Sequence, residues 1–271
     1  MIKLKLFFKY FFVAIGVIAS IITILCIFQD ISEFLQNYKL STIFVSIGLS
    51  CFYALWQIKD KTQISVKLKN TLKVNIFYGD IFKQKDIIVI PVNEYFDTIV
   101  DNKIIAENTL HGKFIKQFFG GNERELKMQI NNQLKNIKEF SINENRKVGN
   151  KKRYKLGTTM EIKKDDKIFY LVAFTRFNKN NRAEINKIEY LEVLIKLFDY
   201  IEQYSNAKKV NLPLLGGGHS GINLSKQQLL ELILLVLIVV DKLTLINGLN
   251  IILHPSLKNE IDLNRIEYYF K

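Results

Sequence analysis

The most concentrated chemical signal in the sequence is a glycine-rich loop. Residues 214–222 read Leu-Leu-Gly-Gly-Gly-His-Ser-Gly-Ile and follow Pro213 directly. Four glycines in this short stretch expose backbone N–H groups and permit left-handed dihedral angles, which suits a concave site for a diphosphate. A flexible turn is the alternative, with a solvent-facing histidine in it. The residues expected to bind are Gly216, Gly217, Gly218, His219, Ser220, Gly221 and Ile222.

A second candidate loop follows Pro91 and reads Val-Asn-Glu-Tyr-Phe-Asp-Thr. Asn93 stands just past an expected strand end, where its amide can bond a ribose hydroxyl; a turn residue is the alternative. Glu94 and Asp97 follow in the same loop.

The second loop leads to Leu-His-Gly-Lys-Phe at 110–114, at the expected start of a helix. Gly112 there allows an anion to approach free N–H groups, and Lys113 adds a positive charge. His111 taken by itself is more typical of a structural position.

A third candidate is the Gly-Asp turn after the first strand of the soluble part, Gly79-Asp80-Ile81. Asp80 can accept a hydrogen bond from an exocyclic amine such as that of adenine. An ordinary turn is the simpler interpretation of a Gly-Asp pair.

Alternating strands and helices must position these loops. Apolar β-rich runs at 74–78, 87–90, 168–174, 209–214 and 249–254 alternate with helical patterns at 122–137, 184–204 and 225–240. This order predicts an α/β domain with a largely parallel sheet, and a hairpin of 154–162 with 168–174 makes the sheet mixed.

The three prolines of the chain all stand where expected strands stop. Pro91, Pro213 and Pro255 therefore mark one edge of a parallel sheet, at which the ligands of such sheets bind.

Two uncharged apolar runs precede the soluble part. Residues 10–28 and 40–58 are each long enough to cross a bilayer, so residues 1–60 are predicted to form a transmembrane hairpin. Lysines flank both outer ends, whereas the connection is acidic, which predicts cytoplasmic termini and a multi-pass inner-membrane protein. Ser46 and Ser50 share one face, for packing on the first helix or for oligomerisation.

The net charge of +13 does not require a nucleic-acid partner. Residues 61–72 are expected to be a basic juxtamembrane linker that is attracted to anionic lipid. A further basic cluster at 146–155, with Arg146 and Arg153, is interpreted as solvated surface. The only cysteines, Cys26 and Cys51, lie in the apolar runs, so we expect neither a disulfide nor a metal site.

Together, and in this order, the three loops resemble the macro domain, a three-layer α/β/α fold that binds ADP-ribose and related nucleotides. The resemblance covers about residues 73–271. It implies adenine recognition at Asp80 and Ile81, distal-ribose recognition at Asn93, and a diphosphate loop at 216–222.

Residues 91–98 and 110–114 behind a two-helix membrane module resemble, more narrowly, the ThsA effectors of bacterial Thoeris anti-phage systems. For that family the resemblance implies a TIR-domain partner that makes an ADP-ribose-derived signal, a macro domain that senses it, and membrane damage that aborts the infection. It implies a homo-oligomer that needs no cofactor and catalyses no reaction.

A membrane-tethered ADP-ribosyl hydrolase is the alternative, with Asn93 and Asp97 orienting or activating a water. Hydrolytic macro domains usually carry a glycine-rich stretch after the asparagine. Residues 94–108 contain no glycine, which favours binding over hydrolysis.

Overall fold

A computed structural model describes residues 2–69, 72–120, 122–178, 182–218, 220–240 and 243–270. The chain divides into two compact units. One comprises residues 1–61 and 262–269, and the other comprises residues 62–261 with the last two residues. Each unit is described by itself.

The first unit is helical. Its elements are α1 (Ile2–Leu25), α2 (Gln29–Asn37), α3 (Lys39–Gln57) and α8 (Leu263–Phe270). Helices α1 and α3 are both long and apolar enough to cross a membrane. Compared with the predicted spans, α1 begins earlier and ends at Leu25, before the turn at 26–28, and α3 matches closely.

Helices α1 and α3 pack against each other as a hairpin. Ser50 and Ala54 of α3 are fully buried, and the Tyr10 and Tyr53 rings meet edge to face at 6.4 Å. The buried Ser50 favours the packing interpretation of the serine face. Gly48, in contrast, has open space around the position of a Cβ atom, so it lies on an outer face of the hairpin.

The C-terminal helix α8 belongs to this helical unit, although the sequence assigned it to the soluble domain. Asn264 donates to the backbone oxygens of Ile58 and Lys59, just beyond the end of α3, and Lys61 pairs with Glu267. These partners lie about two hundred residues apart in sequence, so no local sequence pattern predicts the contacts between them.

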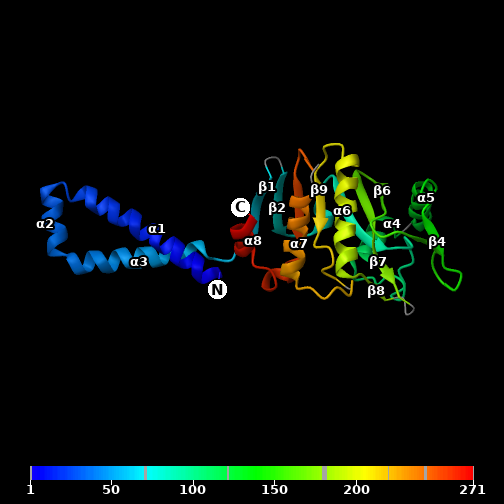
Figure 1. The fold of residues 1–271 in the computed structure, drawn as a ribbon, viewed down its shortest axis with the longest axis horizontal. Helices are drawn as coiled ribbons and strands as arrows, with labels where there is room; N and C mark the ends of the chain where they lie inside the picture. The colour runs from blue at the N-terminus through cyan, green and yellow to red at the C-terminus, as the bar shows by residue number, and fades with distance from the viewer. Residues whose placement is uncertain are drawn as a thin grey trace. The chain divides into compact units, whose positions relative to one another are not determined.

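The second unit is an α/β domain around a mixed sheet (Figure 1). The strand order is β1-β2-β10-β9-β3-β7-β6, with β8 on β7 and a separate β4–β5 hairpin. Strands β2, β10, β9, β3 and β7 run parallel, and the edge strands β1 and β6 run antiparallel to their neighbours. The strands are β1 (Gln63–Leu68), β2 (Leu72–Tyr78), β3 (Ile87–Asn93), β4 (Phe140–Ile142), β5 (Lys152–Tyr154), β6 (Thr159–Lys164), β7 (Lys167–Phe177), β8 (Ala183–Glu184), β9 (Val210–Pro213) and β10 (Leu249–Leu253).

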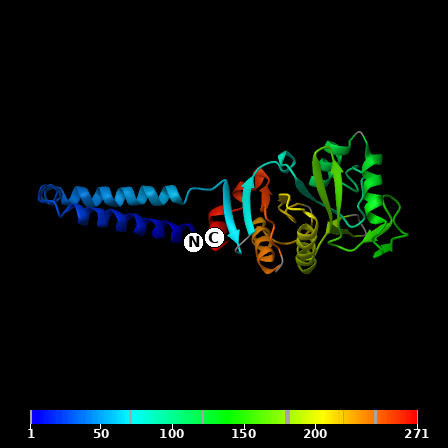
Figure 2. The same cartoon turned by 90° about the horizontal axis from the view of Figure 1, so that it is seen from above.

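Helices cover both faces of the sheet (Figure 2). Helices α4 (Leu110–Phe119) and α5 (Glu123–Leu134) pack with β3 and β7 around Phe114 and Phe169. Helices α6 (Lys187–Tyr204) and α7 (Lys226–Val239) lie side by side on the other face. Short 3-10 helices η1 (Ile81–Lys83) and η2 (Pro255–Asn259) follow β2 and β10.

The predicted mixed α/β sheet is confirmed, including the antiparallel β6–β7 hairpin. The expected basic linker at 61–72 is corrected, because Gln63–Leu68 forms the edge strand β1. Its side chains alternate between exposed and buried, with Ile64, Val66 and Leu68 inside. That alternation is a strand signal, and Lys67 occupies one of the exposed positions of the strand.

Candidate functional site: a cavity at the carboxyl edge of the sheet

A cavity of about 1620 Å³ lies where the parallel strands end. Its walls come from the segments after β2, β3, β9 and β10, from the end of β7, and from the start of α4. Parallel strands bring their carboxyl ends to one edge, so loops far apart in sequence meet there. The candidate residues that line it are Asp80, Ile81, Asn93, His111, Lys113, Gly216, Gly217, Gly218 and Ser220.

Asp80 follows β2 as the N-cap of η1. One carboxylate oxygen accepts the N–H of Phe82 at 2.9 Å, and the side chain stays exposed. A carboxylate has two oxygens, so this cap leaves the second able to accept another hydrogen bond. Ile81 is buried and gives the cavity an apolar wall beside it.

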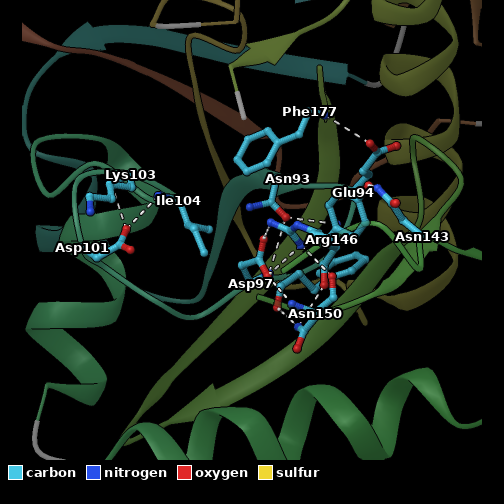
Figure 3. Close-up of polar contacts among 12 residues, drawn as sticks. Asn93, Glu94, Asp97, Asp101, Lys103, Ile104, Asn143, Arg146, Asn150 and Phe177 are labelled. Atoms are coloured by element: carbon cyan, nitrogen blue, oxygen red, sulfur yellow. Dashed lines mark hydrogen bonds and ion pairs between the residues drawn. The ribbon is translucent and has the colours of Figure 1, made fainter. Parts of the chain in front are cut away.

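Asn93 is the last residue of β3 and is 4% exposed. Its Oδ1 accepts the N–H groups of Tyr95 at 3.0 Å and of Asp97 at 3.4 Å (Figure 3). This network fixes which end of the amide is oxygen. The Asn93 NH₂ group is therefore the part that is left to donate into the cavity.

The glycine-rich loop is a tightly braced turn. Gly217 N donates to Leu214 O at 3.1 Å, Ser220 Oγ donates to Gly216 O at 3.1 Å, and Lys226 Nζ donates to Gly217 O. The buried Tyr190 of α6 also donates to Leu215 O at 3.2 Å.

Individual glycines of the loop meet different constraints. Gly216 has a φ of +78°, so a side chain there would be strained, whereas a Cβ at Gly218 would meet no atom within 4 Å. A Cβ on Gly217 would lie 3.0 Å from Leu214 O. Gly218 is thus the position where a side chain enters the cavity without disturbing the loop.

Several candidate residues lie elsewhere. Gly221 and Ile222 line a separate hollow of about 500 Å³ beside Arg176 and Glu189. Gly112 is not part of the cavity wall, and a Cβ on it would lie 2.3 Å from Ala106 O, so it serves close backbone packing. His219 lies outside the described residues.

Glu94 and Asp97 are buried but do not line the cavity. The Asp97 carboxylate accepts two hydrogen bonds from the Arg146 guanidinium, at 2.6 Å and 3.1 Å, and one from the N–H of Asn150 at 2.8 Å (Figure 3). Glu94 accepts from Arg153 at 2.8 Å and from Phe177 N at 3.1 Å. Both carboxylates therefore stabilise, through these hydrogen bonds, the segments beside the cavity.

The basic cluster at 146–155 is therefore not simply solvated surface, as the sequence suggested. Arg146 is 8% exposed, and its guanidinium lies 3.8 Å from the centre of the Tyr95 ring. Asn150 donates to the carbonyls of Tyr95 and Phe96. A buried carboxylate needs a charged or hydrogen-bonding partner, so two acids on either side of the aromatic pair Tyr95 and Phe96 were the signal for these residues.

His111 is 8% exposed, lines the cavity at the second residue of α4, and has no hydrogen-bond partner among the described residues. Burial lowers the pKa of His111 to about 3, because the charged imidazolium would lose its hydration. The imidazole is therefore neutral at physiological pH.

An α/β/α sandwich with a mixed sheet and a nucleotide-sized cavity at the strand ends defines the macro-domain class. A solved point mutant of the Oceanobacillus iheyensis macrodomain shares the fold with a TM-score of 0.50 and 13% identity, over 77% of this chain and 98% of that one.

The particular family follows from sequence. Residues 74–254 match the family described as Thoeris protein ThsA, Macro domain. A Thoeris protein ThsA from Bacillus amyloliquefaciens (strain Y2) is 32% identical over 231 residues, which are 82% of this chain and 76% of that protein. The chain belongs to the Thoeris ThsA macro-domain family.

Proposed function

We propose that this chain is a membrane effector of a bacterial anti-phage system, whose macro domain senses an ADP-ribose-derived nucleotide. The observation that carries the proposal is the meeting of Asp80, Asn93 and Gly216–Gly218 around one cavity in a member of the ThsA family. A TIR-domain partner would make the signal from NAD, and the infected cell would die before the phage matures.

Each loop of the cavity offers chemistry that suits one part of such a ligand. The free oxygen of Asp80 can accept the exocyclic amine of adenine, and the Asn93 NH₂ group can donate to a ribose hydroxyl. The braced turn at Gly216–Gly218 brings backbone close to a diphosphate, with no side chain between them.

The apolar helices α1 and α3 supply the membrane part of the proposal. Ligand binding would favour an assembly of hairpins that breaks the inner membrane. A ligand shifts the equilibrium between separate and assembled hairpins only by the difference between its binding free energies for the two states. A difference of about 5.5 kcal/mol changes the population from almost entirely separate to almost entirely assembled. The protein would therefore act as a homo-oligomer.

Substitution of Gly218 tests the nucleotide assignment sharply, because the position has room for a side chain. Gly218→Glu places a carboxylate against the diphosphate, whereas Gly218→Gln has nearly the same size and no charge. We expect Gly218→Glu to abolish binding of ADP-ribose and Gly218→Gln to weaken it much less, by calorimetry on the full chain in detergent. Equal binding by the two variants would remove the diphosphate from this loop.

The hydrolase alternative needs a group that activates water. Asp97, the candidate for this role, does not line the cavity. Its carboxylate accepts hydrogen bonds from Arg146 and Asn150 instead. Incubation of the protein with ADP-ribosylated substrate is the direct test, and turnover at ordinary enzymatic rates would displace the sensor proposal.

A further inference from the structure

The C-terminal helix α8 is held at the end of the apolar hairpin. Asn264 is buried, and its side-chain NH₂ group donates to the backbone oxygens of Ile58 at 3.4 Å and of Lys59 at 3.2 Å, the two residues that follow α3. Lys61 pairs with Glu267 further along α8. Both views show α8, in red, next to the N-terminal end of α1 (Figure 1, Figure 2). The helix therefore lies where both apolar helices have their ends.

The outer face of α8 carries two adjacent tyrosines. Leu263 and Ile266 of the same helix are buried, whereas Tyr268 is 46% exposed and Tyr269 is 58% exposed. The two tyrosine rings meet edge to face at 5.2 Å. A tyrosine has an apolar ring and a polar hydroxyl, so it is most favourable where one end of the side chain is apolar and the other is wet.

The bonds of Asn264 limit the depth of these rings relative to the hairpin. Tyr268 and Tyr269 follow Asn264 in the helix by a rise of about 6–8 Å. The polar layer on each side of a bilayer's hydrocarbon core is about 5–8 Å thick. With α3 across the core, both tyrosines lie within or beside the headgroup layer, whichever way α8 points. Trp56 in the last turn of α3 is also exposed there, and such rings are enriched at this depth.

The charges around α8 are compatible with contact to lipid phosphates. Two acids beside the end of α3 are each neutralised by a lysine, namely Asp60 by Lys3 at 2.6 Å and Glu267 by Lys61. The Arg265 guanidinium lies 6.0 Å from the centre of the Tyr269 ring, and Lys59 is exposed. Basic side chains next to a span are attracted to anionic lipid.

We propose that α8 is an interfacial anchor, in which Tyr268 and Tyr269 bind the headgroup layer of the leaflet at that end of the hairpin. The partner is a lipid surface, with the rings at the boundary of the hydrocarbon and the hydroxyls towards the phosphates. The inference rests on the membrane part of the proposed function. It gives the chain a membrane contact on both sides, in sequence, of the macro domain at 62–261.

The experiment uses single-tryptophan variants, because Trp56 is the only tryptophan of the chain. The full chain in vesicles of phosphatidylcholine and phosphatidylglycerol carries the reporter as Trp56, or as Tyr269→Trp or Met128→Trp in a Trp56→Phe background. Met128 is 59% exposed on α5 of the macro domain and is the matched control. Each reporter meets two quenchers separately, lipid brominated on its acyl chains near the headgroup and acrylamide in the water.

We expect brominated lipid to quench Tyr269→Trp by as large a fraction as it quenches Trp56. The emission of Tyr269→Trp should lie at shorter wavelength than that of Met128→Trp, which acrylamide alone should quench. A thermal unfolding midpoint equal to that of the parent checks the fold of each variant. Tyr268→Trp in the same background serves as the second reporter if Tyr269→Trp does not fold.

Three results would overturn the inference. Quenching of the α8 reporter by acrylamide and not by lipid would place α8 in water, and resistance to both quenchers would indicate a second copy or another protein on α8. Equal lipid quenching of all three reporters would mean that the whole macro domain adsorbs to the bilayer. If Trp56 itself is not quenched by lipid, the hairpin is outside the bilayer, and the membrane part of the proposed function fails together with the inference.

Discussion

At the scale of single residues, two acids that were expected to contact the ligand instead stabilise the loop beside the cavity. Glu94 and Asp97 look like ligand-contacting residues because they follow Asn93 in a loop at the edge of the sheet. Their carboxylates instead connect this loop to Arg153 and Arg146 and to the end of β7. These two acids thus contribute to the site by holding neighbouring segments in place.

The Arg146–Asp97 pair gives the first prediction. Arg146→Met leaves the fully buried Asp97 carboxylate without its cation, which should lower the free energy of unfolding by about 3–5 kcal/mol. Lys147→Met is the matched control, because Lys147 is exposed and should change little. Thermal unfolding in detergent measures both, and equal midpoints for the two variants would contradict a structural role for the pair.

The second prediction concerns His111 and pH. Its pKa is lowered from 6.5 to about 3 in the folded chain, so between these values the unfolded chain binds more protons than the folded one. Stability therefore falls as the pH falls through 6.5, by about 1.4 kcal/mol per unit, or ~2 kcal/mol at pH 5.

Comparison with His111→Leu isolates this contribution, because the other titrating groups are shared. The stability difference between parent and His111→Leu should grow in favour of the variant from pH 7.5 to pH 5. A difference that stays constant over this range would show that His111 titrates alike in the folded and unfolded chain.

At the scale of elements, the two apolar helices present different faces. Ser50 of α3 is buried inside the hairpin, and Gly48 lies on an open face. The two positions separate packing within one hairpin from association between hairpins.

The third prediction uses this difference. Gly48→Leu should leave ADP-ribose affinity and hairpin folding intact but reduce cell toxicity, if close approach between hairpins builds the active assembly. Ser50→Leu should instead disturb the hairpin itself and lower protein abundance. If Gly48→Leu is as toxic as the parent at the same protein abundance, the open face has no part in assembly.

At the scale of the whole molecule, the chain passes between its two units twice, at residues 61–62 and 261–262. Tyr78, at the end of β2, bonds to the macro-domain side of both passages. Its N–H donates to Thr62 O at 3.3 Å, and its hydroxyl donates to Ile261 O at 3.2 Å. The next two residues, Gly79 and Asp80, line the cavity.

The fourth prediction follows from this position. Tyr78→Phe keeps the ring and removes the bond to Ile261, so ADP-ribose affinity should change by less than about threefold while the toxic response weakens. Phe at a position that already contacts solvent should fold normally. Full toxicity at parental affinity and abundance would exclude Tyr78 from the coupling between nucleotide and membrane.

The fifth prediction concerns topology. Lysines at both outer ends of the hairpin favour a cytoplasmic location of the two termini. A tag at either end should resist external protease in spheroplasts and become sensitive after lysis. Cleavage of a C-terminal tag by external protease would show that the C-terminus lies outside the cytoplasm and would contradict the prediction.

The sequence alone determined the features that depend on local pattern. Strand and helix order and the glycine turn follow from periodicity and backbone chemistry within a few residues. The rule that parallel strands end at one edge then predicted that Asp80, Asn93 and Gly216 lie close together.

Only the tertiary structure decided which side chains are paired. Arg146 meets Asp97 across 49 residues, and Asn264 meets the end of α3 across more than two hundred. Periodicity reports whether a residue is buried and not which partner it meets, because the partner depends on loops whose paths no local rule fixes. The same limit explains why the sequence assigned Glu94 and Asp97 to the ligand, although their carboxylates pair with Arg153 and Arg146.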